Sequence, residues 1–306
     1  MNWKLRLVLA FMQWRRPLDF REGISVPKMR RQAEQAARLG QRLFDRKQVV
    51  SRIENGQAGD IPVRIYYPEA NALRPAIVYF HGGGFALYGL DSHDWLCRRL
   101  CHMNNMVVIS VDYRLAPEHT FPAAHEDAWN AFQWVVDNAR RLSIDPARIA
   151  VAGDSAGGNL SACLAHRCRK QGVSLWAQLL LYPFIDGRLK NPSITRNGQG
   201  YLLTREALFW FQKTYVPREE DRCLPEVSPC FEADFTKLAP ALILTAQYDP
   251  LLDDGFLYAE QLRSAGVRVS YREYPQLVHG FMNIPHVARE ALWAFDDIHG
   301  FLRSIS

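Results

Sequence analysis

The sequence predicts an α/β fold built on a mostly parallel, eight-stranded sheet with helices on both faces. Short apolar runs rich in small and β-branched residues recur along the chain, and most are separated by stretches with helical spacing of apolar residues. One run, residues 148–152, enters a tight glycine-containing turn that leads directly into such a helical stretch. With 306 residues, 48% hydrophobic and 23% charged, the chain can bury a sizeable core.

The strands are expected in eight short runs. Helical stretches between most of them imply crossover connections, and therefore parallel strands that are covered on both faces. The first two runs are separated by a turn signal at residues 54–56 and not by a helix, so we expect an antiparallel edge. Residues 126–142 should form one covering helix, and Pro275 is a breaker after the last strand. In chain order, strands are expected at residues 48–52, 61–67, 76–80, 106–111, 148–152, 177–181, 241–245 and 267–271.

Two segments depart from this alternation, and we expect them to form a helical cap. Within residues 1–47, apolar residues recur at helical spacing in 5–14 and again in 29–44, so two helices there need a surface to cover. Residues 186–227 lie between two expected strands and contain turn signals and an aromatic cluster, which indicates an inserted helical cap segment. The α/β core is then made of residues 48–185 and 228–306.

Charge is distributed unevenly along the chain. Residues 1–47 carry twelve Lys and Arg against four Asp and Glu, a net charge of +8, so the remainder of this +5 chain carries −3. A membrane-surface helix or a nucleic-acid contact is an alternative role for this segment, but acidic residues interrupt it and no binding motif accompanies it. We expect no nucleic-acid partner. We also expect no stable membrane insertion, because residues 5–14 are too short to span a bilayer.

The number and spacing of the cysteines indicate a cytoplasmic protein. The six cysteines show no C-x-x-C spacing, and the N-terminal apolar run lacks a small-residue cleavage site. We therefore expect reduced thiols and a cytoplasmic location. The oligomeric state is open between monomer and dimer.

Ser155 lies in the turn between residues 148–152 and a helical stretch that ends at Gly172, within a G-x-S-x-G pattern. A strand, a tight turn with a serine and a helix are the setting of a nucleophile elbow, which exposes the serine hydroxyl at the sheet edge. Gly153 and Gly157 suit such a turn because a Cβ atom there is expected to collide with neighbouring backbone. A glycine-rich turn with no catalytic role is the alternative.

A serine nucleophile needs a base, and the base needs a carboxylate. Among nine histidines, His279 fits best, because it follows the last expected strand in the chain order serine, acid, histidine. Asp249 comes directly after the strand at 241–245, at the carboxyl end of the sheet. Asp253 and Asp254 are rivals, but they fall one turn later, where they are expected to compensate a helix dipole.

Consecutive glycines after a buried strand can supply the donors that an oxyanion needs. Gly82, Gly83 and Gly84 follow the run at 76–80, and without side chains their N–H groups can point into a pocket. The N–H of Ala156, the residue after the serine, is a further expected donor. A phosphate cradle is disfavoured, because there is no G-x-x-x-x-G-K-[ST] and the glycines do not form G-x-G-x-x-G before a helix. His81 is expected to anchor this loop by hydrogen bonds.

These motifs, in this order, resemble those of the bacterial hormone-sensitive-lipase-like esterases of the α/β-hydrolase superfamily. The resemblance covers about residues 75–281. It rests on His81-Gly82-Gly83-Gly84-Phe85, Asp112-Tyr113-Arg114-Leu115-Ala116-Pro117-Glu118, Phe121-Pro122-Ala123-Ala124, Gly153-Asp154-Ser155-Ala156-Gly157-Gly158-Asn159, Asp249-Pro250-Leu251 and His279-Gly280-Phe281.

The resemblance implies an α/β-hydrolase fold and hydrolysis of carboxylic esters through an acyl-enzyme, with no metal or other cofactor. It implies Ser155, Asp249 and His279 as the catalytic triad. The resemblance also implies an oxyanion hole whose main donors are Gly83, Gly84 and Ala156. Two further motif residues, His81 and Asp154, are implied as supports of these motifs.

The substrate is less closely defined than the reaction. The resemblance implies a small ester with a short acyl chain, but the two cap segments carry no motif that identifies it. An amide, N-formyl or sugar-acetate hydrolase with the same triad is the main alternative. A non-catalytic receptor for a small ligand is another, disfavoured because His279 is present. Residues 112–114 and Glu118 resemble the family's buried polar brace.

Overall fold

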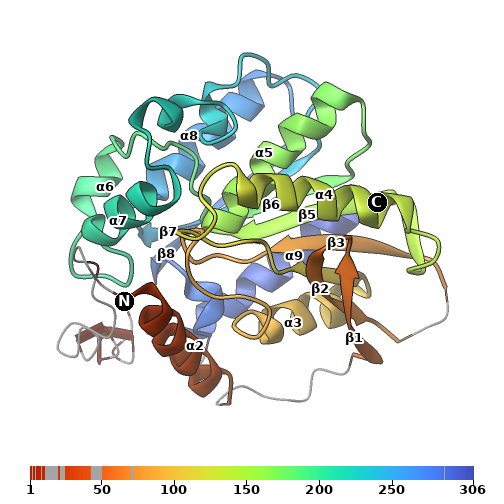
Figure 1. Cartoon of the computed structure of the whole chain (residues 1–306), viewed down its shortest axis with the longest axis horizontal. Helices are drawn as coiled ribbons and strands as arrows, with labels where there is room; N and C mark the ends of the chain where they lie inside the picture. The colour runs from red at the N-terminus through yellow and green to blue at the C-terminus, as the bar shows by residue number, and fades with distance from the viewer. Residues whose placement is uncertain are drawn as a thin grey trace.

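The computed structural model describes residues 1, 3, 5–7, 9–10, 20, 25–42, 50–69, 72–285 and 287–306. Its central sheet has eight strands in the order β1-β2-β4-β3-β5-β6-β7-β8 (Figure 1). β2 is antiparallel to both of its neighbours, and the other pairs are parallel, which confirms the predicted sheet. The strands are β1 (Arg52–Ala58), β2 (Ile61–Tyr67), β3 (Arg74–Phe80), β4 (Val107–Val111), β5 (Ile144–Asp154), β6 (Ala177–Leu181), β7 (Ala241–Tyr248) and β8 (Val269–Val278).

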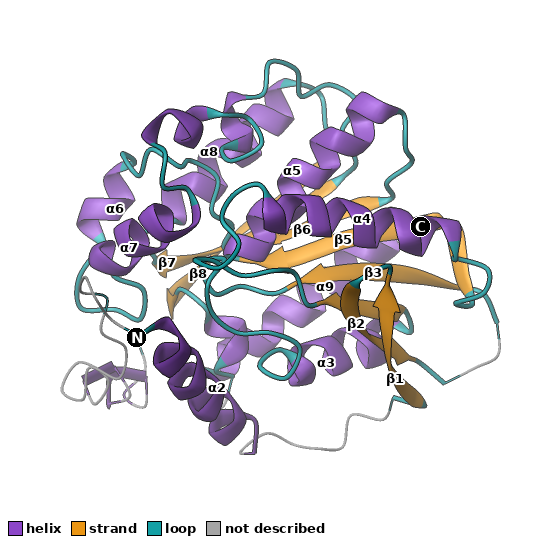
Figure 2. Ribbon diagram, in the orientation of Figure 1, coloured by secondary structure: helices purple, strands orange, loops and turns teal. Residues whose placement is uncertain are grey.

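Helices cover both faces of the sheet (Figure 2). Along β3, Ile77 and Tyr79 face one core while Val78 and Phe80 face the other, because successive side chains of a strand point to opposite sides. α3 (Asp94–Asn104) and α9 (Trp293–Ser304) pack on the first face. The second face is covered by α4 (Ala123–Asp137), α5 (Ala156–Gln171) and α8 (Leu252–Ser264). A helix was predicted at residues 126–142. α4 begins three residues earlier, at Ala123, and ends five residues earlier, at Asp137.

The remaining helices lie in the N-terminal region, in the segment between β6 and β7, and around the C-terminal connections. They are α2 (Val26–Arg42), α6 (Pro192–Arg196), α7 (Arg205–Tyr215), and the 3-10 turns η1 (Glu219–Cys223), η2 (Pro229–Phe231), η3 (Phe281–Asn283) and η4 (Arg289–Leu292).

The predicted turn at residues 54–56 is wrong. β1 runs through these residues and pairs with β2 without a break. The hairpin turns instead at Gly59 and Asp60, where Gly59 has φ +64°, a backbone conformation that suits a two-residue hairpin loop. β1 tolerates polar residues because it is an edge strand that is mostly exposed. Residues 48–49 of the predicted first strand lie outside the described residues.

β8 continues through Pro275, where the sequence predicted a break. β8 is the other edge of the sheet, and a proline without an N–H is tolerated on an edge strand. The strand is irregular there, with Gln276 at φ +64° and a register shift opposite β7. Its longer course brings Val278 opposite Tyr248, so the residues that follow these two strands emerge side by side.

α2, α6 and α7 gather at the end of the sheet where the parallel strands finish (Figure 1). α2 packs through Met29 and Ala33 against Leu87, which follows β3, and Trp210 and Phe211 of α7 lie against the same cluster. α2 and α7 therefore meet, although more than 160 residues separate them in the chain.

Parts of the two predicted N-terminal helices, residues 8, 11–14 and 43–44, lie outside the described residues. Leu5 and Leu9 are buried in the core that includes α3 and α9. Within the described ranges we find no helix with the length and apolar character that crossing a bilayer requires. All six cysteines are unpaired.

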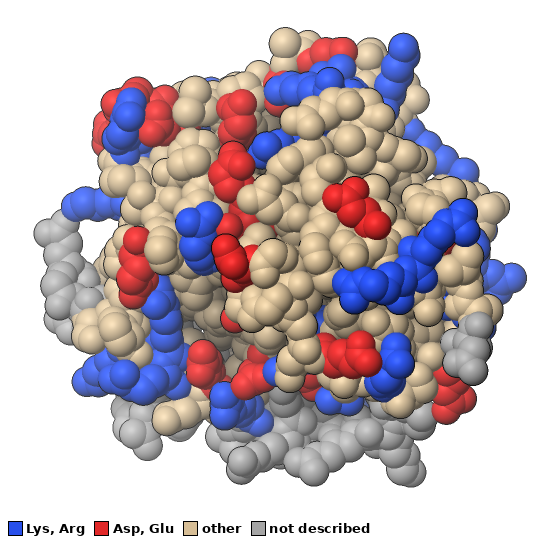
Figure 3. Space-filling view, turned by 45° about the vertical axis from the view of Figure 1, so that its right-hand side comes forward, with Lys and Arg blue, Asp and Glu red and all other residues tan. Residues whose placement is uncertain are grey.

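Acidic and basic side chains are interspersed on the face of the molecule seen in Figure 3. Several of the basic residues are paired, as Arg30 is with Glu118 and Arg38 with Asp91. On this face the charged side chains do not form the one-sided basic patch that is typical of nucleic-acid-binding proteins.

Candidate active site

Ser155 lies in a strained turn between β5 and α5. Its φ is +56° and its ψ −114°, a combination that residues with a side chain rarely adopt. The turn leaves no room for side chains beside it: a Cβ atom at Gly153 would overlap the carbonyl of Gly157, and one at Gly157 would overlap that of Phe80. The Ser155 N–H donates to the Leu181 carbonyl at 2.9 Å. The sheet thus fixes the serine at the carboxyl end of β5.

His279 and Asp249 form a hydrogen-bonded chain with Ser155. His279 Nε2 lies 2.9 Å from Ser155 Oγ, and His279 Nδ1 lies 2.7 Å from Asp249 Oδ2. Asp249 is fully buried and His279 is 8% exposed. Because the carboxylate can only accept, Nδ1 carries the proton and Nε2 is left to accept from the serine hydroxyl. The structure therefore brings together three residues that the sequence analysis singled out.

The Asp249 carboxylate is fixed by its own loop. Its Oδ1 accepts the N–H of Leu251 at 2.7 Å, which turns Oδ2 toward the histidine. The rival carboxylates have other partners: Asp253 and Asp254 accept backbone N–H groups from residues 185–193. Of the three aspartates considered, the structure places Asp249 against His279.

The glycine loop, residues 81–84, follows β3 and supplies amides near the serine turn. Gly83 and Gly84 have φ values of +114° and +60°, in the region that favours glycine. In the part of the chain that is described, the N–H groups of Gly83, Gly84 and Ala156 donate to no protein group. They remain available to a negatively charged oxygen, and the Ala156 N–H also stands at the positive end of the α5 dipole.

Gly82 is not an oxyanion donor, contrary to the prediction, because its N–H donates to Asp154 Oδ1 at 2.8 Å. The same oxygen accepts the Tyr79 hydroxyl at 2.7 Å and lies 3.2 Å from His93 Nε2, and Asn283 Nδ2 lies 3.3 Å from Oδ2. Burial acts to raise the pKa of Asp154, but the charge and hydrogen bond of His93 and the Tyr79 hydroxyl outweigh it and lower the pKa to about 2. A buried carboxylate therefore ties the glycine loop to the serine turn.

His81 holds the glycine loop from within. Its Nδ1 donates to the Gly82 carbonyl at 2.7 Å, and its ring stacks on Tyr113 with centroids 4.3 Å apart. The Tyr113 hydroxyl donates to the His81 carbonyl at 2.6 Å. Burial lowers the pKa of His81 to about 3, so the ring is neutral near pH 7. The geometry is that of an anchor.

Comparison with known proteins gives this site a context. A family model described as an alpha/beta hydrolase fold matches residues 77–283. The chain is 45% identical over 250 residues to carboxylesterase NlhH of Mycobacterium tuberculosis, which covers 78% of each protein. It is 38% identical to an ethyl acetate hydrolase of Pseudomonas putida, covering 88% of this chain and 86% of that protein. The chain belongs to the hormone-sensitive-lipase-like esterase family.

The likeness extends to the whole fold. A solved hyperthermophilic esterase from the archaeon Pyrobaculum calidifontis superposes with a TM-score of 0.93 at 39% identity, covering 100% of this chain and 99% of that chain. The superposition therefore includes the regions before and after the residues that the family model matches.

The polar brace expected from the family resemblance is only partly buried. Tyr113 is buried, but the side chains of Arg114 and Glu118 are 49% and 48% exposed. Glu118 accepts two hydrogen bonds from Arg30 of α2, at 2.6 and 3.0 Å, and Arg30 also donates to two backbone carbonyls beside the glycine loop. The exposed end of this motif therefore fastens α2 to the esterase core.

Apolar side chains of the segment between β6 and β7 lie close to Gly84 and Gly280. Phe211 of α7 lies so close to Gly84 that a Cβ atom there would overlap its ring. Phe20 packs edge-on against Phe211, with ring centroids 5.3 Å apart. Leu202 lies 3.7 Å from a Cβ atom built on Gly280, the residue after the catalytic-site histidine. Apolar side chains from the N-terminal region and from the segment between β6 and β7 thus pack together near Gly84.

His125, which the sequence analysis missed, links α4 to α5 and α7 by hydrogen bonds. Its Nδ1 lies 2.8 Å from the Tyr215 hydroxyl and its Nε2 lies 3.0 Å from Asn159 Oδ1. Asn159 Nδ2 donates to the carbonyls of Phe184 and Val227, which turns its oxygen to the histidine. Burial lowers the pKa of His125 to about 4. Position in the sequence was the signal that could have identified this pair, because His125 directly follows one family motif and Asn159 ends another.

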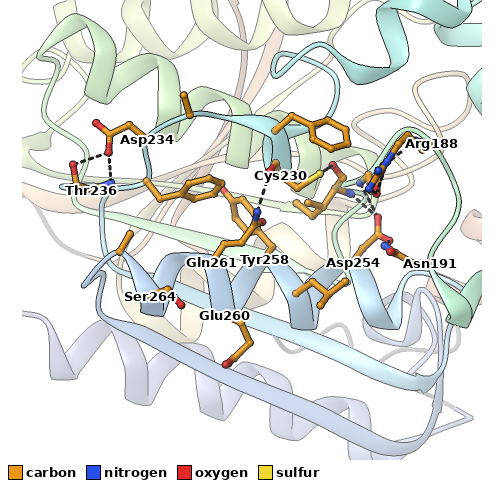
Figure 4. Close-up of a pocket in the computed structure, with 17 residues that line it drawn as sticks. Arg188, Asn191, Cys230, Asp234, Thr236, Asp254, Tyr258, Glu260, Gln261 and Ser264 are labelled. Atoms are coloured by element: carbon orange, nitrogen blue, oxygen red, sulfur yellow. Dashed lines mark hydrogen bonds and ion pairs between the residues drawn. The ribbon is translucent and has the colours of Figure 1, made fainter.

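A surface cavity of about 700 Å³ lies away from the triad (Figure 4). It is bounded by α8 and by residues 185–191 and 230–236, and none of Ser155, Asp249 and His279 lines it. Within the described ranges, no three His, Cys, Asp or Glu side chains converge as ligands for a metal ion. The side chains of Ser155, His279 and Asp249 are suited to nucleophilic and acid–base chemistry.

Proposed function

We propose that this chain is a serine esterase that hydrolyses small carboxylic esters with short acyl chains through an acyl-enzyme on Ser155. The chain is a carboxylic ester hydrolase, as its family and its relatives are. The observation that carries the mechanism is the continuous hydrogen-bonded chain from Ser155 Oγ through His279 to the buried Asp249 carboxylate.

The reaction uses each group in its present position. Ser155 Oγ attacks the ester carbonyl while His279 Nε2 takes the hydroxyl proton, and the Asp249 carboxylate stabilises the resulting imidazolium. The carbonyl electron pair moves to the oxygen, which the free N–H groups of the glycine loop and the serine turn stabilise. The carbon–oxygen bond to the alcohol then breaks, and the alcohol leaves with the proton from His279. Water, deprotonated by His279, repeats these steps on the acyl-enzyme.

Two observations support the short acyl chain. Phe211 lies against Gly84 and limits the space beside this oxyanion donor, and Phe20 packs against Phe211. One relative, which shares 38% identity over most of both chains, is named for hydrolysis of ethyl acetate. A short acyl group fits beneath such a cover, whereas a long one needs the cap side chains to move.

We assign residues 1–47 and 186–227 to the cap and residues 48–185 and 228–306 to the core. The support is that Phe20 and Phe211, one from each proposed cap segment, pack together, and that Phe211 lies against Gly84 of the glycine loop. A cytoplasmic location is part of this proposal, and its support is the six unpaired cysteines, because reduced thiols are the norm in that compartment.

The test is turnover of a series of soluble aryl esters from acetyl to dodecanoyl, alongside matched anilides, an N-formyl compound and an acetylated sugar, with purified protein and its Ser155→Ala variant. We expect the highest kcat/KM on the shortest esters, little turnover of anilides, and loss of activity in Ser155→Ala. Preference for anilides, N-formyl compounds or acetylated sugars would transfer the assignment to the alternative hydrolases. A preference for long acyl chains would overturn the proposed substrate class.

A further inference from the structure

The acid of the triad sits on a loop that is held both by the core and by the segment 186–227. Residues 247–250, here called the acid loop, comprise the last two residues of β7 and the two that follow, and they carry Asp249. The Leu251 N–H donates to Asp249 Oδ1, and the Leu252 N–H donates to the Asp249 carbonyl at 3.1 Å. The Gln247 carbonyl lies where the register between β7 and β8 shifts. A carbonyl at such an irregularity needs a donor, and a carbonyl oxygen that already has one donor can accept a second.

Asn197, which ends α6 in the segment 186–227, supplies those donors. Its Nδ2 donates to the carbonyl of Gln247 and to the carbonyl of Asp249, at 3.0 Å each. One side-chain amide group thus bridges the two residues on either side of Tyr248. Asn197 is only 5% exposed, so water does not compete freely for these carbonyls.

The rest of α6 is docked on the same loop. The Ser193 hydroxyl donates to the Pro250 carbonyl at 2.6 Å, and the Ser193 N–H donates to Asp253 at 2.7 Å. Asn191 donates to Asp254 at 2.6 Å, a contact that Figure 4 shows at one end of the surface cavity. Leu251 packs with apolar residues of the same segment, namely Leu189, Ile194 and Leu208. α6 is therefore fixed relative to the acid loop by both polar and apolar contacts.

We infer that Asn197 is a positioning residue of the esterase: it holds the backbone of the acid loop so that the Asp249 carboxylate stays aligned with His279. This inference rests on the proposed function. The carboxylate contributes only when it meets His279 Nδ1 at hydrogen-bond distance, and misplacement of a catalytic group by about 1 Å costs roughly 100-fold in rate. The segment 186–227 would then complete the triad as well as cover the substrate.

The matched variants are Asn197→Leu and Arg196→Ala. Leucine has nearly the size of asparagine but cannot donate to either carbonyl. Arg196 is the neighbouring residue on α6, and it forms only an exposed ion pair with Asp253. We expect Asn197→Leu to lower kcat roughly 10- to 100-fold with KM unchanged, and Arg196→Ala to leave both constants unchanged.

The decisive measurement repeats Asn197→Leu in an Asp249→Ala background. If Asn197 acts through Asp249, its substitution has no further effect on kcat once that carboxylate is gone. An equal loss in both backgrounds, or no loss in the wild-type background, would overturn the inference. The far-downfield proton NMR signal of the histidine–carboxylate hydrogen bond should also weaken in Asn197→Leu and persist in Arg196→Ala.

Ser193→Ala keeps the inference testable if Asn197→Leu does not fold. It removes one hydroxyl that holds Pro250, so the same loss should appear with smaller size and should again vanish in the Asp249→Ala background. An equal loss in both backgrounds would count against the inference here too. Failure of the proposed function gives a different result: Ser155→Ala and Asp249→Ala themselves would then retain full activity.

Discussion

The N–H of Gly82 donates to the carboxylate of Asp154 at 2.8 Å, and this bond connects the loop of oxyanion donors to the turn that carries the nucleophile. The two segments come from different strands, β3 and β5, which are neighbours in the sheet. Because Asp154 immediately precedes Ser155, any movement of this carboxylate shifts the serine and the glycine loop relative to each other. The reactivity of the site therefore depends on a buried group that does not touch the substrate.

Asp154→Asn tests this connection. Asparagine keeps the shape, but it can accept at only one of the two oxygen positions and places an NH₂ group toward His93 or Gly82. We expect kcat to fall roughly 10- to 100-fold with little change in KM, because the oxyanion donors act mainly in the transition state. We also expect a loss of about 3 kcal/mol in the free energy of unfolding, because Asp154 is a buried carboxylate that accepts several hydrogen bonds. Steady-state kinetics and urea denaturation measure the two effects, and a folded variant with normal kcat would refute the connection.

His166 provides a prediction about acid stability away from the catalytic residues. It is 1% exposed on α5, its Nε2 lies 3.0 Å from the Tyr258 hydroxyl, and burial, assisted by the charges of Arg169 and Lys170, lowers its pKa from 6.5 to about 3. Below pH 6.5 the unfolded chain takes up a proton at this residue while the folded protein does not. The free energy of unfolding should therefore fall from pH 6.5 down to about pH 3, by up to about 1.4 kcal/mol per pH unit for this group.

His166→Gln should remove that contribution and flatten the dependence of stability on pH, with activity at pH 7 retained. Urea denaturation between pH 7 and pH 4 measures the slope. His119→Gln, at an exposed histidine, is the control and should leave the slope as it is in the wild type. An identical slope in wild type and His166→Gln would show that this histidine is not held neutral by the fold.

Phe211 is predicted to set the acyl-chain preference, because its ring covers Gly84 in the glycine loop. Phe211→Ala opens space beside the oxyanion donors, and pocket changes of a few methylene groups shift relative specificity at least about 10-fold. We expect the ratio of kcat/KM for octanoyl over acetyl esters to rise roughly 10-fold. The control is Phe209→Ala. Phe209 lies on the same helix and is 40% exposed, so its substitution should leave the ratio unchanged. Equal ratios in both variants would remove Phe211 from substrate selection.

The sequence was sufficient to predict the sheet and the three residues that meet at its edge. Ser155 and Asp249 follow the apolar strands β5 and β7, and His279 could be chosen by its place in the chain order after the last strand. The carboxyl ends of these parallel strands share one edge of the sheet. The serine turn could be recognised because its requirement for glycine at positions 153 and 157 is local and steric.

The errors and omissions have a common physical cause, since each depends on contacts between distant segments. Gly82 cannot be distinguished from Gly83 and Gly84 by residue type, and only the position of Asp154 shows that its N–H is occupied. Likewise, Pro275 is tolerated because β8 is an edge strand, and the order of strands in the sheet cannot be read from the sequence. Asn197 had no motif to identify it, because its role depends on where α6 meets the acid loop.

The claim on which the mechanism depends is that Ser155 is the nucleophile. The direct measurement is intact-mass and peptide mass spectrometry after treatment with a fluorophosphonate, together with the remaining esterase activity. We predict one adduct per chain, located on Ser155, with activity lost in proportion to labelling, and no adduct in Ser155→Ala. Full esterase activity in a chain completely labelled at Ser155, or in Ser155→Ala, would contradict the account.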